Sequence, residues 1–166
     1  IITLKNSFHG RTITTLIATG QDHFHNYFFP FTEGFSYVEA NDIDALKATY
    51  TKKTCAVMME LVQGEGGVLP LDKGYVKAVE KFCHDNDLLL IIDEVQTGIY
   101  RTGQLFAFME YGISPDVVTT AKGLAGGLPI GAILANEKCA NVLTAGTHAT
   151  TFGGNPISSA AAIYVL

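Results

Sequence analysis

Three short apolar runs in this sequence are each followed closely by residues that could do chemistry. Runs of this length, apolar almost throughout, are typical of strands buried in a parallel sheet. In open α/β sheets, ligands bind at the carboxyl ends of the strands. The sequence therefore predicts a site where carboxylates and a lysine meet at one sheet edge. The runs are Cys55–Met59, Leu88–Ile92 and Val117–Thr120, and the polar residues after them are Glu60, Asp93 with Glu94, and Lys122.

Lys122 is the candidate nucleophile. It lies in the string TTAKGLAGG, residues 119–127, directly after an apolar run and before a glycine-rich turn. Small neighbours leave room for a flat ligand, and desolvation would lower the pKa of the amine toward nucleophilic use. A single lysine is more often a surface charge, so the pattern favours a function without proving one.

Two turns offer further binding groups. Phe8 and Arg11 place an aromatic face and a guanidinium within one short segment, and the donors of an arginine match both oxygens of a carboxylate. The string Gly64–Gly67 predicts a loop with glycine-only conformations, of the kind that can pass close to a ligand. A solvated arginine beside a core phenylalanine, and a plain tight turn, remain equally good interpretations of these two strings.

The string LLLIIDE has a second interpretation. An apolar strand that ends in Asp93 and Glu94 also occurs in P-loop nucleotide hydrolases. Those enzymes need the phosphate-binding string GxxxxGK[ST], which this chain does not contain. The five histidines show no metal-ligand spacing with cysteines or carboxylates, and we assign them no metal.

The elements that must position these groups form a βαβ pattern. Residues 74–87 carry apolar side chains at helical spacing between the first two runs, which indicates a mostly parallel sheet with helices on its faces. No repeat or linker marks an internal domain boundary. Three more helices are predicted: one capped by Asn41-Asp42 and running through Thr49, one over Leu105–Tyr111, and one opened by Asn155-Pro156.

Composition excludes several classes of protein. Of 166 residues, 48% are hydrophobic and 16% charged, so a buried core is expected and disorder is not. With 11 basic and 16 acidic residues the net charge is −5, and no basic stripe predicts nucleic-acid binding. No apolar run approaches the length of a membrane span. The three cysteines are isolated, which favours a reducing, cytoplasmic compartment.

The two ends of the sequence suggest a piece of a longer protein. It begins on Ile-Ile-Thr-Leu and closes on an apolar helical pattern over residues 160–166. We therefore expect the isolated 166 residues to be inactive.

Five strings, in order, resemble the class III (subgroup II) pyridoxal-phosphate-dependent aminotransferases of fold type I. Each string is weak alone, and their shared order is specific. Two departures are mild: Leu61 stands where that family commonly has Pro, and Ala149 where it usually has Gly. The strings are NSFHGRT from Asn6, ELVQGEGG from Glu60, DEVQTG from Asp93 with RTG from Arg101, AKG from Ala121, and TTFGGNP from Thr150.

The resemblance implies a cofactor, pyridoxal 5'-phosphate (PLP), and roles for the residues around it. Lys122 would carry the cofactor and move a proton, and Asp93 would pair with the pyridine nitrogen. Gln96 would hydrogen-bond the ring's 3-hydroxyl. Val95 and Phe8 would sandwich the ring. Residues 1–166 would then form the central part of the PLP-binding large domain, with the small domain and flanking segments outside them.

Other roles follow from the same resemblance. Thr150 and Thr151 would reach the cofactor phosphate of a neighbouring subunit, which implies a homodimer with shared active sites. Arg11 would bind the substrate's α-carboxylate. Glu65 would act as a gate that admits both an amino donor and 2-oxoglutarate, and Glu60 would support the site from behind.

Within this family the glycine-rich strings are most similar to bacterial enzymes that transfer the δ-amino group of N-acetylornithine to 2-oxoglutarate, a step of arginine biosynthesis. Ornithine δ-aminotransferases and other ω-aminotransferases of the class, including those for succinylornithine and 4-aminobutyrate, are the alternatives. A more remote alternative is a non-catalytic binding module of the same fold or a fragment of a nucleotide hydrolase.

Overall fold

The three predicted strands are all present in the computed structural model, which describes residues 1–166. Their observed bounds are β3 (Ala56–Met59), β6 (Leu89–Asp93) and β7 (Val117–Thr120). The chain divides into two units, residues 1–91 and 92–166, and the division falls inside β6.

In the first unit the strand order is β2-β1-β3-β6. Strand β1 pairs in parallel with both β2 and β3. All three residues of β1 are buried, as is expected of an inner strand of a parallel sheet. The sequence analysis did not predict β2 as a strand. The bounds are β1 (Ile2–Leu4) and β2 (Ser36–Val38).

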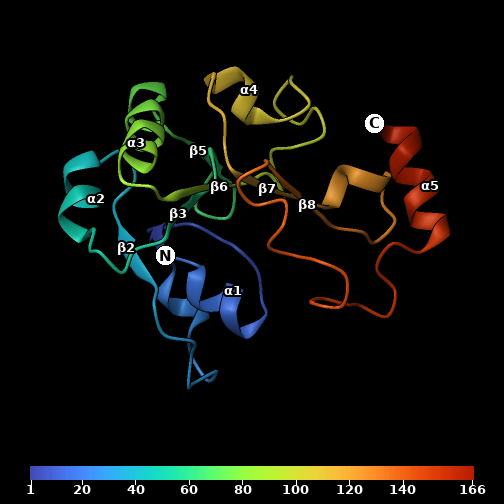
Figure 1. The fold of residues 1–166 in the computed structure, drawn as a ribbon, viewed down its shortest axis with the longest axis horizontal. Helices are drawn as coiled ribbons and strands as arrows, with labels where there is room; N and C mark the ends of the chain where they lie inside the picture. The colour runs from blue at the N-terminus through green and yellow to red at the C-terminus, as the bar shows by residue number, and fades with distance from the viewer. The chain divides into compact units, whose positions relative to one another are not determined.

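The helices of the first unit lie on opposite sides of its strands: α1 is drawn on one side, and α2 and α3 on the other (Figure 1). The buried face of α3 consists of Tyr75, Val76, Val79 and Cys83, at the predicted helical spacing. The helices are α1 (Ile13–Ala18), the 3-10 turn η1 (Asp22–Phe24), α2 (Ile43–Thr49) and α3 (Lys73–Asp85).

The predicted cap of α2 is half right. Asp42 caps the helix, because its Oδ1 accepts a hydrogen bond from the Ala45 N–H at 2.8 Å. Asn41 does not cap α2; its Oδ1 accepts instead from the Asp72 N–H at 2.9 Å, next to the start of α3. Asn41 thus joins the beginnings of the two helices.

A small antiparallel hairpin follows β3. Strands β4 (Val62–Gln63) and β5 (Leu69–Pro70) pair around the predicted glycine loop. Inside this loop, the N–H groups of Gly67 and Val68 both donate to the Gly64 carbonyl at 3.2 Å. The loop is therefore a tight, internally bonded turn.

In the second unit the strand order is β6-β7-β8, with β8 (Ala132–Ala135) antiparallel to β7. The sequence analysis missed β8. The helices here are α4 (Ala107–Tyr111), the 3-10 turn η2 (Lys122–Ala125) and α5 (Pro156–Val165). Helix α5 packs on η2 through Ala162, Leu124 and Ala125 (Figure 1).

Helix α4 is shorter than predicted, because Leu105 belongs to the loop that precedes the helix. Its carbonyl accepts hydrogen bonds from the N–H groups of Ile99 and Tyr100, so it closes the preceding loop. The helix begins at Ala107 and ends at Tyr111, and the next residue, Gly112, has a φ of 65°, the left-handed conformation common after helix ends. For α5 the prediction is confirmed: the Asn155 Oδ1 accepts from the Ser158 N–H at 2.9 Å, and Pro156 is the first helical residue.

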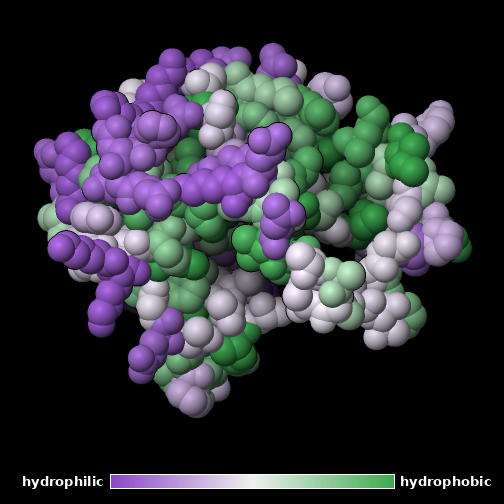
Figure 2. Space-filling model, in the orientation of Figure 1, coloured by the Kyte–Doolittle hydropathy of each residue, from purple (hydrophilic) through white to green (hydrophobic).

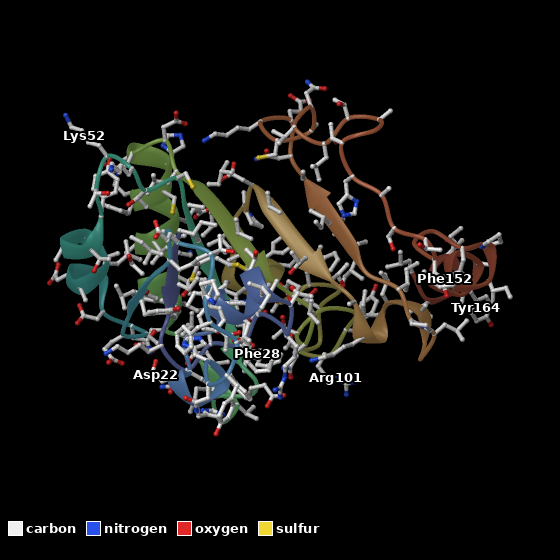
Figure 3. The ribbon with its side chains drawn as sticks, turned by 90° about the horizontal axis from the view of Figure 1, so that it is seen from below. Asp22, Phe28, Lys52, Arg101, Phe152 and Tyr164 are labelled. Atoms are coloured by element: carbon white, nitrogen blue, oxygen red, sulfur yellow. The ribbon has the colours of Figure 1, made fainter.

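The two units differ in their surfaces. Hydrophilic side chains gather over α2 and α3 (Figure 2). At the end of the second unit, Phe152 and Tyr164 are drawn at α5, and they are 81% and 93% exposed (Figure 3). None of the helices has both the length and the apolar character that crossing a membrane requires. The predicted fold class, a mostly parallel α/β sheet with helices packed on it, is confirmed.

Candidate functional site

In the second unit, Asp93 ends β6 and is 6% exposed. Its Oδ1 accepts a hydrogen bond from the Val95 N–H at 3.0 Å, which sets the orientation of the carboxylate. A buried carboxylate held in this way at a strand's carboxyl end is well placed to bind a cationic nitrogen of a ligand.

Glu94, the next residue, is fully buried, and both oxygens of its carboxylate accept hydrogen bonds from the protein. One oxygen of its carboxylate accepts from the Phe108 N–H at 2.8 Å, and the other accepts from the hydroxyl of Thr97. Its backbone N–H donates to the Thr119 carbonyl of β7 at 2.9 Å. Glu94 thus connects the end of β6 to β7, to its own loop and to the first turn of α4.

Gln96 lies in the same loop. Its Nε2 is buried and has no hydrogen-bond partner within the protein. A buried amide without a partner carries a free-energy cost unless something outside the chain accepts from it. The position therefore fits a ligand that offers an oxygen to Gln96.

Lys122 follows β7 by two residues and has a φ of 45°. This is the left-handed region, which costs a non-glycine residue free energy and which seven other non-glycine residues of the chain also adopt. The side chain is exposed, so the desolvation that we expected for this amine is not found in the chain by itself. Gly123, Gly126 and Gly127 surround it with little bulk.

In the first unit, Arg11 lies near the ring of Phe8, with which the sequence analysis grouped it, and near a second ring. The guanidinium carbon lies 5.7 Å from the centroid of Phe8 and 4.5 Å from that of Phe24. The two rings meet edge to face, 5.5 Å apart. The sequence analysis missed Phe24, which η1 brings to Arg11 from another part of the chain.

Glu60 directly follows β3 and is 2% exposed. Its Oε2 accepts from the Phe8 N–H at 2.9 Å, and its Oε1 accepts from the Gly64 N–H at 3.3 Å. One carboxylate thus holds both the segment that carries Phe8 and the turn that carries Glu65.

Two more contacts tie this turn to the first segment. The Gln63 side chain donates to the Lys5 carbonyl at 2.8 Å. A Cβ atom on Gly66 would lie 2.5 Å from the Asn6 carbonyl oxygen, so only glycine fits there. Glu65, between these anchored positions, is exposed.

Thr150 and Thr151 are exposed in the segment that precedes α5. A Cβ on Gly153 would lie 2.0 Å from the Thr150 Cγ2, so this segment folds back closely on itself. Their predicted role involves a neighbouring subunit and stays a prediction.

The residues that the sequence analysis missed are those that hold the candidates in place. Thr97, Phe108 and Thr119 fix Glu94, and Phe24 stacks on Arg11. A partial signal existed for Thr97, which lies in the DEVQTG string. No sequence pattern points to Phe24 or Phe108, because their contacts depend on how distant segments pack.

Comparison with known proteins identifies the family to which this chain belongs. The family model described as aminotransferase class-III matches residues 1–166. An acetylornithine aminotransferase of Haemophilus ducreyi is 58% identical over 167 aligned residues, which cover 100% of this chain and 42% of the relative. A succinylornithine transaminase of Citrobacter koseri is 51% identical over 98% of this chain and 40% of its own length.

The fold has a solved counterpart. The ornithine aminotransferase of Toxoplasma gondii superposes with a TM-score of 0.93 at 38% identity, covering 99% of this chain and 39% of that one. That structure is described as holding PLP at partial occupancy in its active site. The chain thus spans about 42% of the length of the curated relatives it matches.

Proposed function

This chain belongs to the class-III aminotransferases, and from that premise we propose that the protein carrying it is a PLP-dependent acetylornithine aminotransferase of arginine biosynthesis. It would transfer the δ-amino group of N-acetylornithine to 2-oxoglutarate. The observation that carries the proposal is local to the second unit: a buried, oriented Asp93, a buried Gln96 amide without a partner, and a backbone-strained Lys122 after the adjacent strand.

These three residues fit PLP by their chemistry. Asp93 is an ionisable acceptor for the pyridine N–H of the cofactor, and its buried position strengthens that interaction. The orphaned Gln96 Nε2 is a donor for the ring's 3-oxygen. Lys122 supplies the primary amine that binds the cofactor's aldehyde, and its glycine neighbours leave room for the ring.

When bound, PLP supplies an electron sink that stabilises negative charge at the substrate carbon from which a proton is removed. Asp93 holds the proton on the pyridine nitrogen, which keeps that sink effective. The Lys122 Nζ would serve as the base that takes the proton from the substrate carbon and as the acid that gives it back. Val95 would offer an apolar side chain to one face of the ring.

We assign the binding of substrate to residues of the first unit. Arg11 holds the substrate's α-carboxylate with its two parallel donors, and the rings of Phe8 and Phe24 fix its plane. Phe8 also contributes an apolar face for the cofactor ring. Glu65 is the gate: its exposed carboxylate neutralises an arginine supplied by another part of the full-length protein. Glu60 supports both groups.

Three further expectations belong to the same proposal. Thr150 and Thr151 bind the cofactor phosphate of a partner subunit, so the working protein is a homodimer with shared active sites. Residues 1–166 are the central part of its PLP-binding large domain. The partners are small amino and keto acids, with no nucleic acid or membrane, and the compartment is the cytoplasm. The names of the relatives given above support the amino-acid and keto-acid substrates.

The test is an absorption spectrum of the full-length protein with PLP, before and after N-acetylornithine is added. We expect a band near ~420 nm that collapses to ~330 nm with this donor. A band that forms but ignores N-acetylornithine would move the assignment to ornithine, succinylornithine or 4-aminobutyrate. Absence of any band would contradict the assignment as an aminotransferase and would favour a non-catalytic module or a nucleotide hydrolase.

A further inference from the structure

We propose that Glu94 is a positioning residue of the PLP site: it fixes the loop at residues 95–98 and thereby places the amide of Gln96 and the carboxylate of Asp93. The inference rests on the proposed function, because it concerns how the protein prepares itself for the cofactor. Glu94 acts through its neighbours, since both of its carboxylate oxygens accept hydrogen bonds from the protein.

Four hydrogen bonds meet at Glu94. Its backbone N–H donates to the Thr119 carbonyl of β7 at 2.9 Å, and its own carbonyl accepts from the Gly98 N–H at 2.9 Å. Its side chain accepts from the Phe108 N–H at 2.8 Å and from the Thr97 hydroxyl. Glu94, directly before the loop, is therefore fixed to β7 and α4 and also holds the last two residues of the loop, Thr97 and Gly98.

Packing reinforces the same closure. A Cβ on Gly98 would lie 2.7 Å from the Glu94 carbonyl oxygen and 3.2 Å from the ring of Phe106. Thr97 is 4% exposed and Glu94 is 0% exposed. Val95 and Gln96 lie between Glu94 on one side and the anchored Thr97 and Gly98 on the other, and they therefore have little freedom to move.

The first two residues of the loop, Val95 and Gln96, supply the groups that prepare the cofactor site. The Val95 N–H holds the Asp93 Oδ1 at 3.0 Å, so the position of the loop sets the orientation of that carboxylate. The Gln96 Nε2 is buried without a partner. A donor that is already desolvated and oriented loses little entropy when its acceptor arrives.

Burying a carboxylate among neutral donors is unfavourable unless every oxygen is well satisfied. The hydrogen bonds, and not the charge, are what the site needs from Glu94. A glutamine keeps both of them: its Oε1 accepts from the Phe108 N–H, and its Nε2 donates to the Thr97 oxygen. An alanine keeps neither. This difference separates positioning by hydrogen bonds from an electrostatic effect of the charge.

The experiment measures PLP affinity of the full-length apoprotein by absorbance titration, which is a readout independent of turnover. We expect Glu94→Ala to weaken binding about tenfold and Glu94→Gln to remain within about threefold of the unsubstituted protein. Thr97→Val, which removes one donor to Glu94, gives a smaller loss, and Thr97→Ser restores it. Asp85→Asn, at an exposed ion pair on α3, is the matched control and leaves affinity unchanged.

A double-mutant cycle separates positioning from general damage to the fold. Because Glu94 acts in part through Gln96, Glu94→Ala should cost less affinity in the Gln96→Ala background than in the unsubstituted protein. Fully additive losses, or affinities of Glu94→Ala and Thr97→Val equal to that of the control, would overturn the inference while the unsubstituted protein still binds PLP. If Glu94→Ala does not fold, Thr97→Val and Thr97→Ser decide the matter in the same cycle. An unsubstituted protein that binds no PLP would overturn the proposed function itself, and this inference with it.

Discussion

The Glu60 carboxylate accepts a hydrogen bond from the backbone N–H of Phe8 at 2.9 Å, although the two residues lie 52 positions apart in the sequence. The same carboxylate accepts from the Gly64 N–H at 3.3 Å. A single buried side chain thus sets the spacing between the segment that carries Arg11 and the turn that carries Glu65. In the proposed enzyme Arg11 binds the substrate's α-carboxylate and Glu65 is the gate, so Glu60 would govern substrate fit without touching the substrate.

Glu60→Ala should destabilise the full-length protein by about 2 kcal/mol, because two partly buried N–H groups lose their acceptor. We expect KM for both substrates to rise more than kcat falls. Glu60→Gln should be intermediate, since its Oε1 keeps one of the two hydrogen bonds and its Nε2 faces a second donor. Urea denaturation and steady-state kinetics measure the two effects. Equal stability and KM in all three proteins would contradict this assignment.

Gly66→Ala should be harmful although the change is a single methyl group. The new Cβ would lie 2.5 Å from the Asn6 carbonyl oxygen, and a backbone atom cannot swing aside as a flexible side chain can. We expect a lower melting temperature and a raised KM, because the turn must move away from the Phe8 segment. Gly74→Ala is the control: its Cβ has open space in α3 and should leave stability unchanged or slightly higher.

Phe24→Leu should weaken the hold on Arg11, whose guanidinium carbon lies 4.5 Å from the ring centroid. An interaction of a cation with an aromatic face contributes about 0.5–1 kcal/mol at such a partly exposed site. This corresponds to a rise of about two- to fivefold in KM for the amino donor. Phe24→Tyr keeps the aromatic face and should behave like the unsubstituted protein in the same kinetic assay.

Lys122→Ala should abolish transamination, with a loss of about 10³-fold or more, and should remove the visible cofactor band. Asp93→Asn should behave differently. The Asn Oδ1 still accepts from the Val95 N–H, so the loop keeps its shape and PLP still binds. The neutral side chain cannot hold the pyridine proton, and turnover should fall steeply. Retention of full activity by Lys122→Ala would refute the central assignment.

Tyr75 makes the protein sensitive to high pH. Burial raises the pKa of its hydroxyl to about 12, while in an unfolded chain the pKa is near 10. The folded state therefore holds this proton more tightly, and its contribution to stability is complete below pH 10 and disappears as the pH rises toward 12. The hydroxyl is buried without a hydrogen-bond partner, so Tyr75→Phe should be neutral or stabilising by about 1 kcal/mol. Denaturation at pH 7, 10 and 11 should show a smaller loss of stability for this variant.

Several elements follow from the sequence because their causes are local. An apolar run of a few residues has few ways to bury itself, and β3, β6 and β7 lie within one residue of the predicted bounds. The caps of α2 and α5 involve residues three positions apart. By contrast, the sequence analysis missed β2, which is only three residues long, and β8, whose apolar run AILA is no shorter than β7; each pairs with a neighbouring strand that offers hydrogen bonds.

The sequence by itself determined which residues could do chemistry here: a lysine, an aspartate and a glutamine after apolar strands, and an arginine beside a phenylalanine. Only the tertiary structure decided what holds them. Phe24 stacks on Arg11, Phe108 and Thr97 fix Glu94, and Glu60 joins Phe8 to Gly64. A residue type carries its donors and acceptors wherever it stands, whereas its partners are set by how segments far apart in the chain pack together.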